Sequence, residues 1–244
     1  KKQFLVVSIF VNPLQFESKI DFKKYPKTIK NDLRILENFD IDVIFLPGKE
    51  FSKGNLSKIV FELITEKLCG LDRPGHFSGV ATIILKFLNL INPDFLILGK
   101  KDYQQILIIR QLIKDFYFKT KIIERPTIRN KNGLALSSRN SLIPPLKRKV
   151  SYNIFITLQS IANEIKKSGL KKIKLQFYKK NILKLGIEKV NYLEVLNEKN
   201  LSEVDSKPCY ARIFISVCVS NIKLIDNLKI PKKIVLKSGK FVLY

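Results

Sequence analysis

A polar segment directly follows an apolar run near the middle of the sequence, where a buried strand is expected to end. Residues 95–98 are apolar, Gly99 closes the run, and Lys100, Lys101 and Asp102 come next, before a helical pattern. A glycine between a strand and a helix start directs backbone N–H groups toward an anion, and a lysine adds a point charge that suits phosphate. The spacing of a Walker A loop is absent. The alternative is that both lysines are ordinary surface residues and that Asp102 caps the helix.

A second segment carries hydroxyl groups and an arginine side by side. Ser137, Ser138 and Arg139 follow Leu136 in a stretch that is too polar to belong to the core. Two hydroxyls and a guanidinium suit the oxygens of a triphosphate, because each can donate a hydrogen bond. By itself this string is weak evidence, since serines and an arginine stand together by chance in many proteins.

Amide and imidazole side chains form two further candidate clusters. Asn12 and Gln15 follow the first apolar run, and their amides could serve a hydroxyl or a carboxylate of a substrate. The alternative is a plain Asn-Pro turn. His76 is the only histidine and lies in the string RPGHF at residues 73–77. A lone histidine in a loop is more often structural or exposed than catalytic.

The composition is that of a globular protein with a strong positive charge. Lys and Arg number 45 against 21 Asp and Glu, which gives a formal net charge of +24, and 37 of the 45 are lysine. A surface that reads nucleic acid tends to use arginine, whereas lysine is scattered here through nearly every segment. Codon drift toward A and T raises Lys, Ile, Asn and Phe together and explains the charge equally well. We therefore expect no nucleic-acid partner, and a basic nucleic-acid-associated protein stays the weaker alternative.

The sequence gives no sign of membrane insertion or export. No uncharged run reaches the roughly 18 residues that a membrane span needs, and no cleavage-site pattern precedes the first apolar run. Cys69, Cys209 and Cys218 have no metal-ligand spacing and cannot all pair, which suits a reducing compartment. We expect a cytoplasmic protein without a membrane partner.

The elements that must position the polar clusters alternate between strands and helices in the first half. The strands are expected at residues 4–11, 43–46, 95–98 and 121–123, and the helices at residues 28–36, 57–69, 81–90 and 104–116. The continuous apolar run at 4–11 predicts a strand that is buried on both faces. This alternation is typical of a doubly wound parallel sheet, in which ligands bind beyond the carboxyl ends of the strands.

The pattern changes after Pro126. Helices are expected at residues 150–166 and 175–185, and strands at residues 190–196, 210–219 and 222–225. The close succession of strands indicates a small α+β unit with an antiparallel sheet. We expect two domains, residues 1–126 and 127–244, with the basic tail from residue 228 adding little to the core.

Taken together and in their order along the chain, the clusters resemble the pantothenate synthetase (pantoate–β-alanine ligase) family. The matching strings are VSIFVNPLQF at 7–16, YPKT at 25–28, CG and RPGHF between 69 and 77, GVAT at 79–82, GKKDYQQ at 99–105, GLALSSRN at 133–140 and LIDN at 224–227. One string would be weak evidence, but seven in the family's order make coincidence implausible. The similarity covers residues 3 to about 227.

The resemblance implies a fold and a reaction. The fold is a Rossmann-like parallel-sheet nucleotidyltransferase domain followed by a smaller α+β C-terminal domain, usually in a homodimer. In the reaction, ATP and pantoate give pantoyl adenylate and pyrophosphate with the help of Mg²⁺. The amine of β-alanine then takes the pantoyl group, and AMP and pantothenate are released.

The resemblance also assigns residues to the substrates. It places Gln15 and Gln105 at pantoate, with Gln15 also near β-alanine, while Asn12 stays a candidate substrate amide from its position after the first apolar run. It makes catalytic donors of Lys101, Ser137, Ser138 and Arg139. The residues that it assigns to ATP are Gly99, Lys100, Lys101, Asp102, Ile128, Leu136, Ser137, Ser138 and Arg139. No residue is assigned to a metal.

Two features depart from the family pattern. The family's loop normally has Glu where this chain has Lys100, which replaces an acid with a base beside the phosphates. The family also carries a histidine signature in a first segment, whereas this sequence starts at what resembles the family's second strand, and His76 is no substitute by position. We expect a longer chain or a loss at its start, and little ligase activity from residues 1–244 alone. A remnant that binds ATP or pantoate without joining them is the alternative.

Overall fold

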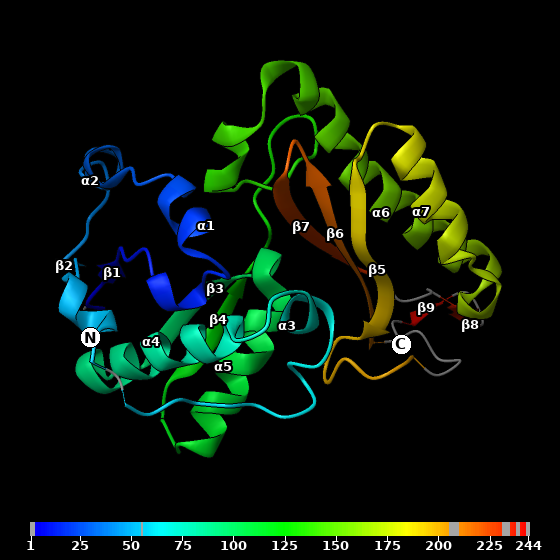
Figure 1. Cartoon of the computed structure of the whole chain (residues 1–244). Helices are drawn as coiled ribbons and strands as arrows, with labels where there is room; N and C mark the ends of the chain where they lie inside the picture. The colour runs from blue at the N-terminus through cyan, green and yellow to red at the C-terminus, as the bar shows by residue number, and fades with distance from the viewer. Residues whose placement is uncertain (1–2, 55, 205–209, 231–234, 238–239, 243–244) are drawn as a thin grey trace.

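The computed structural model describes residues 3–54, 56–204 and 210–230, and the backbone of residues 235–237 and 240–242. Figure 1 shows two halves side by side, the first with parallel strands and helices and the second with an antiparallel sheet backed by two helices. The predicted fold class, an α/β unit followed by a smaller α+β unit, is confirmed. None of the helices in the described stretches is both long enough and apolar enough to cross a bilayer.

The elements follow one another along the chain with short connections, and the short 3-10 helices are labelled η. In order they are β1 (Val6–Ser8), η1 (Pro13–Gln15), α1 (Lys19–Lys24), α2 (Ile29–Leu36), β2 (Val43–Phe45), η2 (Lys49–Ser52), α3 (Leu68–Asp72), α4 (His76–Ile91), β3 (Phe95–Gly99), η3 (Lys100–Asp102), α5 (Tyr103–Asp115), β4 (Lys121–Arg125), η4 (Ser138–Leu142), η5 (Pro145–Lys147), α6 (Arg148–Ser168), η6 (Leu170–Lys172), α7 (Leu175–Lys184), β5 (Lys189–Asn197), β6 (Ala211–Val219), β7 (Ile222–Lys229), β8 (Val235–Lys237) and β9 (Lys240–Val242). Most expected elements are therefore confirmed, with ends shifted by a few residues.

The first half contains two separate pairs of parallel strands. β1 pairs with β2, and β3 pairs with β4 across the crossover helix α5. Among the described residues no ladder joins the two pairs, so the single doubly wound sheet expected from the sequence takes the form of two sheets of two strands. Because β3 and β4 are parallel, their carboxyl ends lie at the same edge, and η3 starts there.

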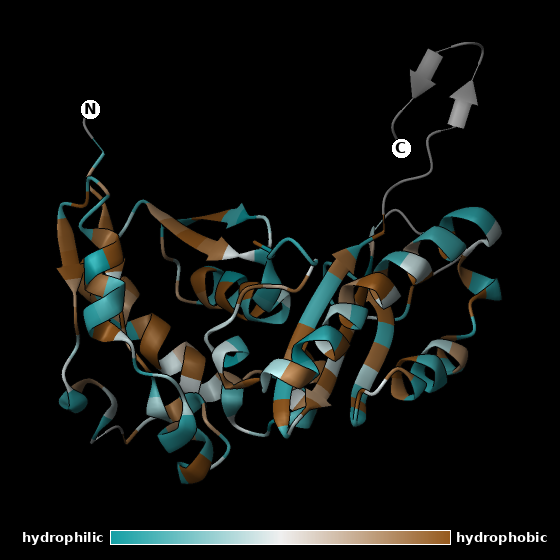
Figure 2. Cartoon of the chain, turned by 90° about the horizontal axis from the view of Figure 1, so that it is seen from above, coloured by the Kyte–Doolittle hydropathy of each residue, from teal (hydrophilic) through white to brown (hydrophobic). Residues whose placement is uncertain are grey.

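β6 packs on both faces and joins the two halves of the molecule. Alternate side chains of a strand point to opposite faces. Ile213, Ile215, Val217 and Val219 lie in the apolar cluster with α6 and α7, whereas Phe214 lies in the cluster with α3 and α5. Figure 2 shows the sheet between α6–α7 and the first half. The order β5-β6-β7 places β7 at one edge of this sheet.

The buried strand expected over residues 4–11 is wrong in length and in burial. β1 spans only three residues, and Phe4 is 71% exposed. β1 pairs with a single described strand, and after Ser8 the chain turns toward η1, where Asn12 binds α4. Among the described residues the apolar run therefore forms a short strand with one paired neighbour, β2, and the connection that follows it.

The helix expected over residues 57–69 is also wrong. The chain is irregular until α3, and Leu63 has a φ angle of 60°, which the interior of a right-handed helix does not contain. Nε2 of Gln104 donates a hydrogen bond to the carbonyl oxygen of Ile64. In a helix this oxygen would accept from a backbone N–H of the next turn instead. Packing against the first half thus overrides the local helical spacing.

The tail also differs in part from expectation. Ile230 is buried and Leu228 packs against the C-terminal core, so the first residues of the tail do contribute to it. The side chains after residue 230, and Cys209, lie outside the described part of the chain.

Candidate functional site

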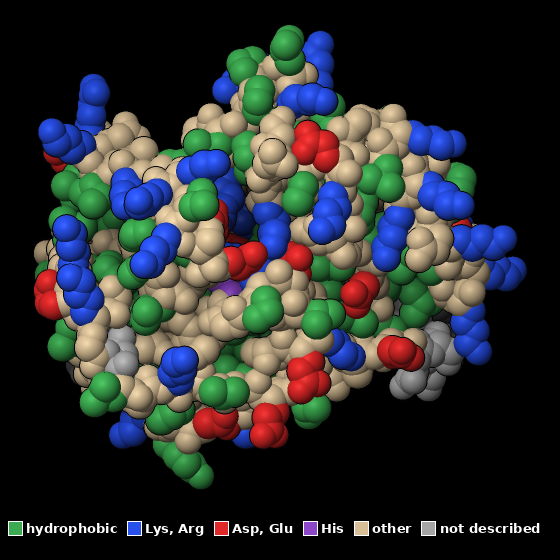
Figure 3. All heavy atoms as spheres, in the orientation of Figure 1, with side chains coloured by type: hydrophobic (Ala, Val, Ile, Leu, Met, Phe, Trp, Pro, Cys, Tyr) green, Lys and Arg blue, Asp and Glu red, His purple; other side chains and the backbone are tan. Residues whose placement is uncertain are grey.

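A cavity of about 780 Å³ lies between the two halves. Its walls come from the η1–α1 region, the start of α4, the η3–α5 turn, the η4 segment and β7. Figure 3 shows a hollow in the middle of one face, with Lys, Arg, Asp and Glu side chains around it. A volume in the range of about 300–1,000 Å³ suits a small-molecule ligand.

Half of the residues that the sequence assigns to substrates line this cavity. The structure brings together Gln15, Lys101, Asp102, Gln105, Ser137 and Arg139. The assigned residues outside the lining are Asn12, Gly99, Lys100, Ile128, Leu136 and Ser138. Segments far apart in the sequence therefore meet where the carboxyl ends of β3 and β4 face the second half.

The two lysines of η3 point to different places. Nζ of Lys101 lies 3.5 Å from Oδ1 of Asp102, and both side chains line the cavity. Nζ of Lys100 lies 3.3 Å from Oε2 of Glu124 on β4, which is not part of the lining. Of these two charges, Lys101 is therefore the one placed for a phosphate inside the cavity.

Arg139 connects the η4 segment to α1. Its Nη2 lies 3.2 Å from Oδ2 of Asp21, and its guanidinium lies 5.2 Å from the ring centre of Tyr25. Its backbone N–H donates to Oγ of Ser137, which caps η4. Ser138 is exposed, and its carbonyl oxygen accepts from Ser141. The guanidinium of Arg139 therefore lines the cavity, and its ion pair with Asp21 keeps it there.

Ile128 and Leu136 pair through their backbones rather than through the cavity. The N–H of Leu136 donates to the carbonyl oxygen of Ile128 over 2.9 Å, and a β-bridge joins Arg129 to Ala135. Both apolar side chains are exposed. Their backbone pairing ends directly before Ser137.

Asn12 is a structural cap in this fold. Its Nδ2 donates to the carbonyl oxygen of Gly79 on α4, and its Oδ1 accepts from the N–H of Leu14. A side chain at Gly79 would stand 2.1 Å from the carbonyl oxygen of Leu14, so only glycine permits this approach of η1 to α4. The contact brings Gln15 to the cavity wall.

His76 lies in the same wall and binds the protein rather than open solvent. Its Nδ1 is 2.8 Å from the carbonyl oxygen of Gln15, and its Nε2 is 3.4 Å from Nη1 of Arg73. Burial and the charge of Arg73 lower the pKa of His76 to about 4. The histidine is therefore neutral at pH 7, where it orders η1.

Sequence patterns did not indicate an ion-pair network that lies at the wall of the cavity. Glu17 pairs with Arg73 and Lys223, and Lys223 also pairs with Asp72. Burial raises the pKa of Glu17, but the bonds and charges of Lys223 and Arg73 outweigh it and leave that pKa lowered. These charges come from α3, β7 and the chain after η1, and no local pattern could have joined them.

Three further site residues were also missed. Gln104 is buried, and its amide binds the backbone of Ile64, Lys67 and Cys69. The cavity is also lined by Asp226 and Asn227 of β7. The LIDN string contains these last two residues, which was the available signal, but it suggested no role.

Two carboxylates of the cavity are already paired with cations of the protein. No group of three or more His, Cys, Asp or Glu in the described part of the chain could hold a metal ion. Asp21 faces Arg139, and Glu17 faces Arg73 and Lys223, so these acids already neutralise cations. The protein groups here fit the phosphates of a nucleotide better than they fit a dedicated divalent ion.

Comparison with known proteins gives one consistent family. The family model described as pantoate-beta-alanine ligase matches residues 1–229. The pantothenate synthetase of Wigglesworthia glossinidia brevipalpis is 38% identical over 239 residues, covering 94% of this chain and 83% of that protein. The pantothenate synthetase of Hydrogenovibrio crunogenus is 35% identical over 233 residues, covering 93% and 82%.

Solved structures agree with the sequence relatives. A crystal structure of pantothenate synthetase from Thermus thermophilus superposes with a TM-score of 0.87 at 32% identity, covering 93% of this chain and 83% of that chain. The Francisella tularensis pantoate-beta-alanine ligase, complexed with beta-gamma ATP and beta-alanine, gives a TM-score of 0.77 at 36% identity, covering 94% and 80%. The chain therefore belongs to the pantoate-beta-alanine ligase family and is a ligase.

Proposed function

We propose that this chain joins pantoate to β-alanine with ATP through a pantoyl-adenylate intermediate. One observation carries the proposal: Lys101 and Arg139, from distant segments, meet Gln15 and Gln105 around one cavity. Cationic donors suit phosphate oxygens, and amides suit the hydroxyl and carboxylate groups of pantoate. The ATP and β-alanine bound to the Francisella tularensis relative support the same pair of substrates.

In the first step the carboxylate of pantoate attacks the α-phosphorus of ATP. A bond forms between the carboxylate oxygen and phosphorus, and the bond to the bridging oxygen breaks, so that pyrophosphate leaves. The carboxylate is already a nucleophile and needs no base. Negative charge grows on the phosphate oxygens, where Lys101, Ser137, Ser138 and Arg139 are the donors that we assign to meet it.

In the second step the amine of β-alanine attacks the acyl carbon of the adenylate. The new C–N bond forms, the C–O bond to AMP breaks, and the proton that the nitrogen loses passes to water. We assign Gln15 and Gln105 to pantoate, with Gln15 also near the amine, and Asn12 to the capping that positions Gln15. Most of the rate gain comes from holding the two reactants in place.

The remaining assignments rest on the family resemblance, because Gly99, Lys100, Ile128 and Leu136 lie outside the cavity lining. We propose that backbone groups of Gly99, Lys100, Asp102 and Leu136 border the phosphates, and that the backbone of Ile128 borders the adenine. Mg²⁺ would be bound mainly by the phosphates of ATP and by water, as is usual for that ion. We also propose a homodimer and a domain boundary at residues 126–127, which sedimentation and limited proteolysis test.

Oxygen labelling tests the intermediate directly. The protein, expressed from its whole reading frame, is given ATP, β-alanine and pantoate with ¹⁸O in its carboxylate. An adenylate pathway transfers one ¹⁸O to AMP and forms AMP and pantothenate in equal amounts. Formation of ADP, or label in phosphate rather than in AMP, would show an acyl-phosphate route and refute the proposal. Exchange of labelled pyrophosphate into ATP that requires pantoate tests the first step alone.

A further inference from the structure

Two neighbouring side chains of β7 hold the two segments that we assign to the phosphates of ATP. Asn227 binds the backbone at Lys100 and Lys101, and Asp226 binds Arg129, close to the chain that leads to Ser137. We propose that Asp226-Asn227 is a positioning element that sets the distance between the Lys101 loop and the 137–139 segment. This inference rests on the proposed function and assigns the spacing of its phosphate donors to the C-terminal sheet.

The Asn227 arm holds the loop by its backbone. Nδ2 of Asn227 donates to the carbonyl oxygens of Lys100 and Lys101, over 2.9 Å and 2.8 Å. Asn227 is only 5% exposed, so water competes little for these bonds. One amide therefore fixes two successive peptide groups, and with them the direction in which the Lys101 side chain leaves the loop.

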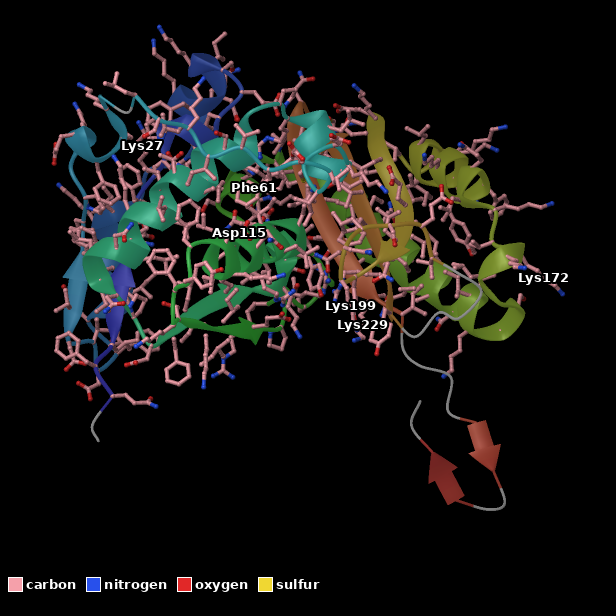
Figure 4. The ribbon with its side chains drawn as sticks, turned by 90° about the horizontal axis from the view of Figure 1, so that it is seen from below. Lys27, Phe61, Asp115, Lys172, Lys199 and Lys229 are labelled. Atoms are coloured by element: carbon pink, nitrogen blue, oxygen red, sulfur yellow. The ribbon has the colours of Figure 1, made fainter. Side chains whose placement is uncertain are left out.

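The oxygen of the Asn227 amide is held by the buried guanidinium of Arg212. Oδ1 of Asn227 accepts from Nη1 of Arg212 over 2.7 Å, and Arg212 also pairs with Glu198 and lies over the ring of Tyr103. Oδ1 must face the cation and Nδ2 must face the two carbonyls, so the amide has one orientation that satisfies every partner. Lys229 also binds Glu198, and Figure 4 shows it at this end of the sheet.

The Asp226 arm holds the other segment. Its carboxylate binds Arg129 through two hydrogen bonds of 2.5 Å and 2.8 Å, and Arg129 also donates to the carbonyl oxygen of Gly133 and lies over the ring of Phe155. Arg129 belongs to the paired stretch that ends directly before Ser137. The bidentate pair therefore fixes where that segment starts.

The two arms are linked to each other and to the sheet. The N–H of Asn227 donates to Oδ1 of Asp226 over 2.7 Å, and in the ladder Asp226 and Asn227 stand opposite Ile215 and Phe214 of β6. Neither side chain is assigned to a substrate, since its polar atoms are occupied by protein groups. The element acts through Lys101 and the 137–139 segment, and a displacement of about 1 Å at reacting groups can cost on the order of 100-fold in rate.

An isosteric substitution at Asn227 removes its bonds to the backbone of Lys100 and Lys101 while it keeps the bond to Arg212. Asn227→Asp keeps the size and the oxygen that binds Arg212, but replaces the donor to the Lys100 and Lys101 carbonyls with a second oxygen. The matched control is Asn197→Asp on β5 of the same sheet, whose Oδ1 accepts from the N–H of Lys199. Asp226→Asn is the second variant and weakens the Arg129 arm without changing its shape. All are assayed as the whole protein at a temperature where circular dichroism shows them folded.

The readout is pantoate-dependent exchange of pyrophosphate into ATP. For Asn227→Asp and Asp226→Asn we expect kcat to fall about 10- to 100-fold while KM for pantoate stays within about twofold, with Asn197→Asp unchanged. Exchange in both variants within about threefold of the control would overturn the inference, as would a rise in KM for pantoate that accounts for the loss. Failure of both variants to fold would also overturn it, because the pair would then serve the fold alone. An unsubstituted protein without pantoate-dependent exchange would instead refute the proposed function.

Discussion

Nδ1 of His76 lies 2.8 Å from the carbonyl oxygen of Gln15, and this contact ties the start of α4 to η1. The carbonyl can only accept a hydrogen bond, so Nδ1 carries the proton, and Nε2 is left to accept from Arg73. The neutral ring can bond to both the Gln15 carbonyl and Arg73. A second proton on Nε2 would instead face the positively charged guanidinium of Arg73. The wall that holds Gln15 is therefore sensitive to acid.

We expect the free energy of unfolding to fall as the pH drops below 7, because the unfolded chain then binds a proton at His76. Its pKa is about 4 in the fold against 6.5 in the unfolded chain, so between these values the unfolded chain binds the proton and the fold does not. His76→Asn keeps a donor for the Gln15 carbonyl and does not titrate. From pH 7 to pH 4 the free energy of unfolding of the parent should drop by about 3 kcal/mol more than that of the variant. Urea unfolding of both across this range measures it, and parallel curves would contradict the assignment.

Lys101 should matter for catalysis and little for stability. In Lys101→Ala we expect pantoate-dependent pyrophosphate exchange to fall by about 100-fold or more, because a preorganised charge at the phosphates is lost. The free energy of unfolding should change by no more than about 0.5 kcal/mol. Lys100→Ala gives the comparison, since that side chain faces Glu124, and its exchange rate should stay within about threefold of the parent. Equal losses in the two variants would place both lysines at ATP.

Arg139 should not be replaceable by lysine. A guanidinium can bind Asp21 and a phosphate through different N–H groups at once, whereas an ammonium is a single point charge. We expect Arg139→Lys to lower exchange by about 10-fold or more, mostly through KM for ATP. Arg110→Lys is the control, because Arg110 pairs with Glu124 outside the cavity. An Arg139→Lys protein with the parent's kinetics would remove the residue from the phosphate site.

Gln104 should be a stability residue despite its place beside the cavity. Gln104→Leu leaves the carbonyl oxygen of Ile64 and the N–H of Cys69 without partners and removes a third bond to Lys67, which should lower the free energy of unfolding by about 2–4 kcal/mol. Gln111→Leu makes the same exchange on the exposed face of α5, where the change should stay within about 0.5 kcal/mol. Urea midpoints of the two variants test the contrast. A Gln104→Leu protein as stable as the control would mean that water replaces the three lost bonds.

Much of the fold could be predicted because its signals are local. The apolar run that ends at Gly99 predicts β3, and the helical spacing of apolar residues after it predicts α5. The same spacing predicts the long amphipathic α6. The 57–69 helix failed because the deciding contact comes from Gln104, about 40 residues away. The apolar run at 4–11 failed because the sequence shows how apolar a strand is, but not how many strands flank it.

The site divides in the same way. Lys101, Ser137 and Arg139 could be placed at one cavity because their strings resemble a family, and the structure brings them together. The opposite directions of Lys100 and Lys101 could not be predicted, since they depend on Glu124 of a neighbouring strand. The contacts of Asn227 also span more than 120 residues, and no periodicity reports such a distance.

The uneven burial of the chain has a consequence for how ligands enter. Among the described residues before Leu68, the only buried side chains are Asn12 and Ser52, whereas α5, α6 and β6 are densely buried. Regions with little buried apolar surface open at low free energy, independently of global unfolding. In hydrogen–deuterium exchange the amides of residues 3–54 should therefore exchange well before those of β6. Because Arg139 pairs with Asp21 in the cavity wall, we expect bound ATP to slow the exchange of these amides more than that of β6.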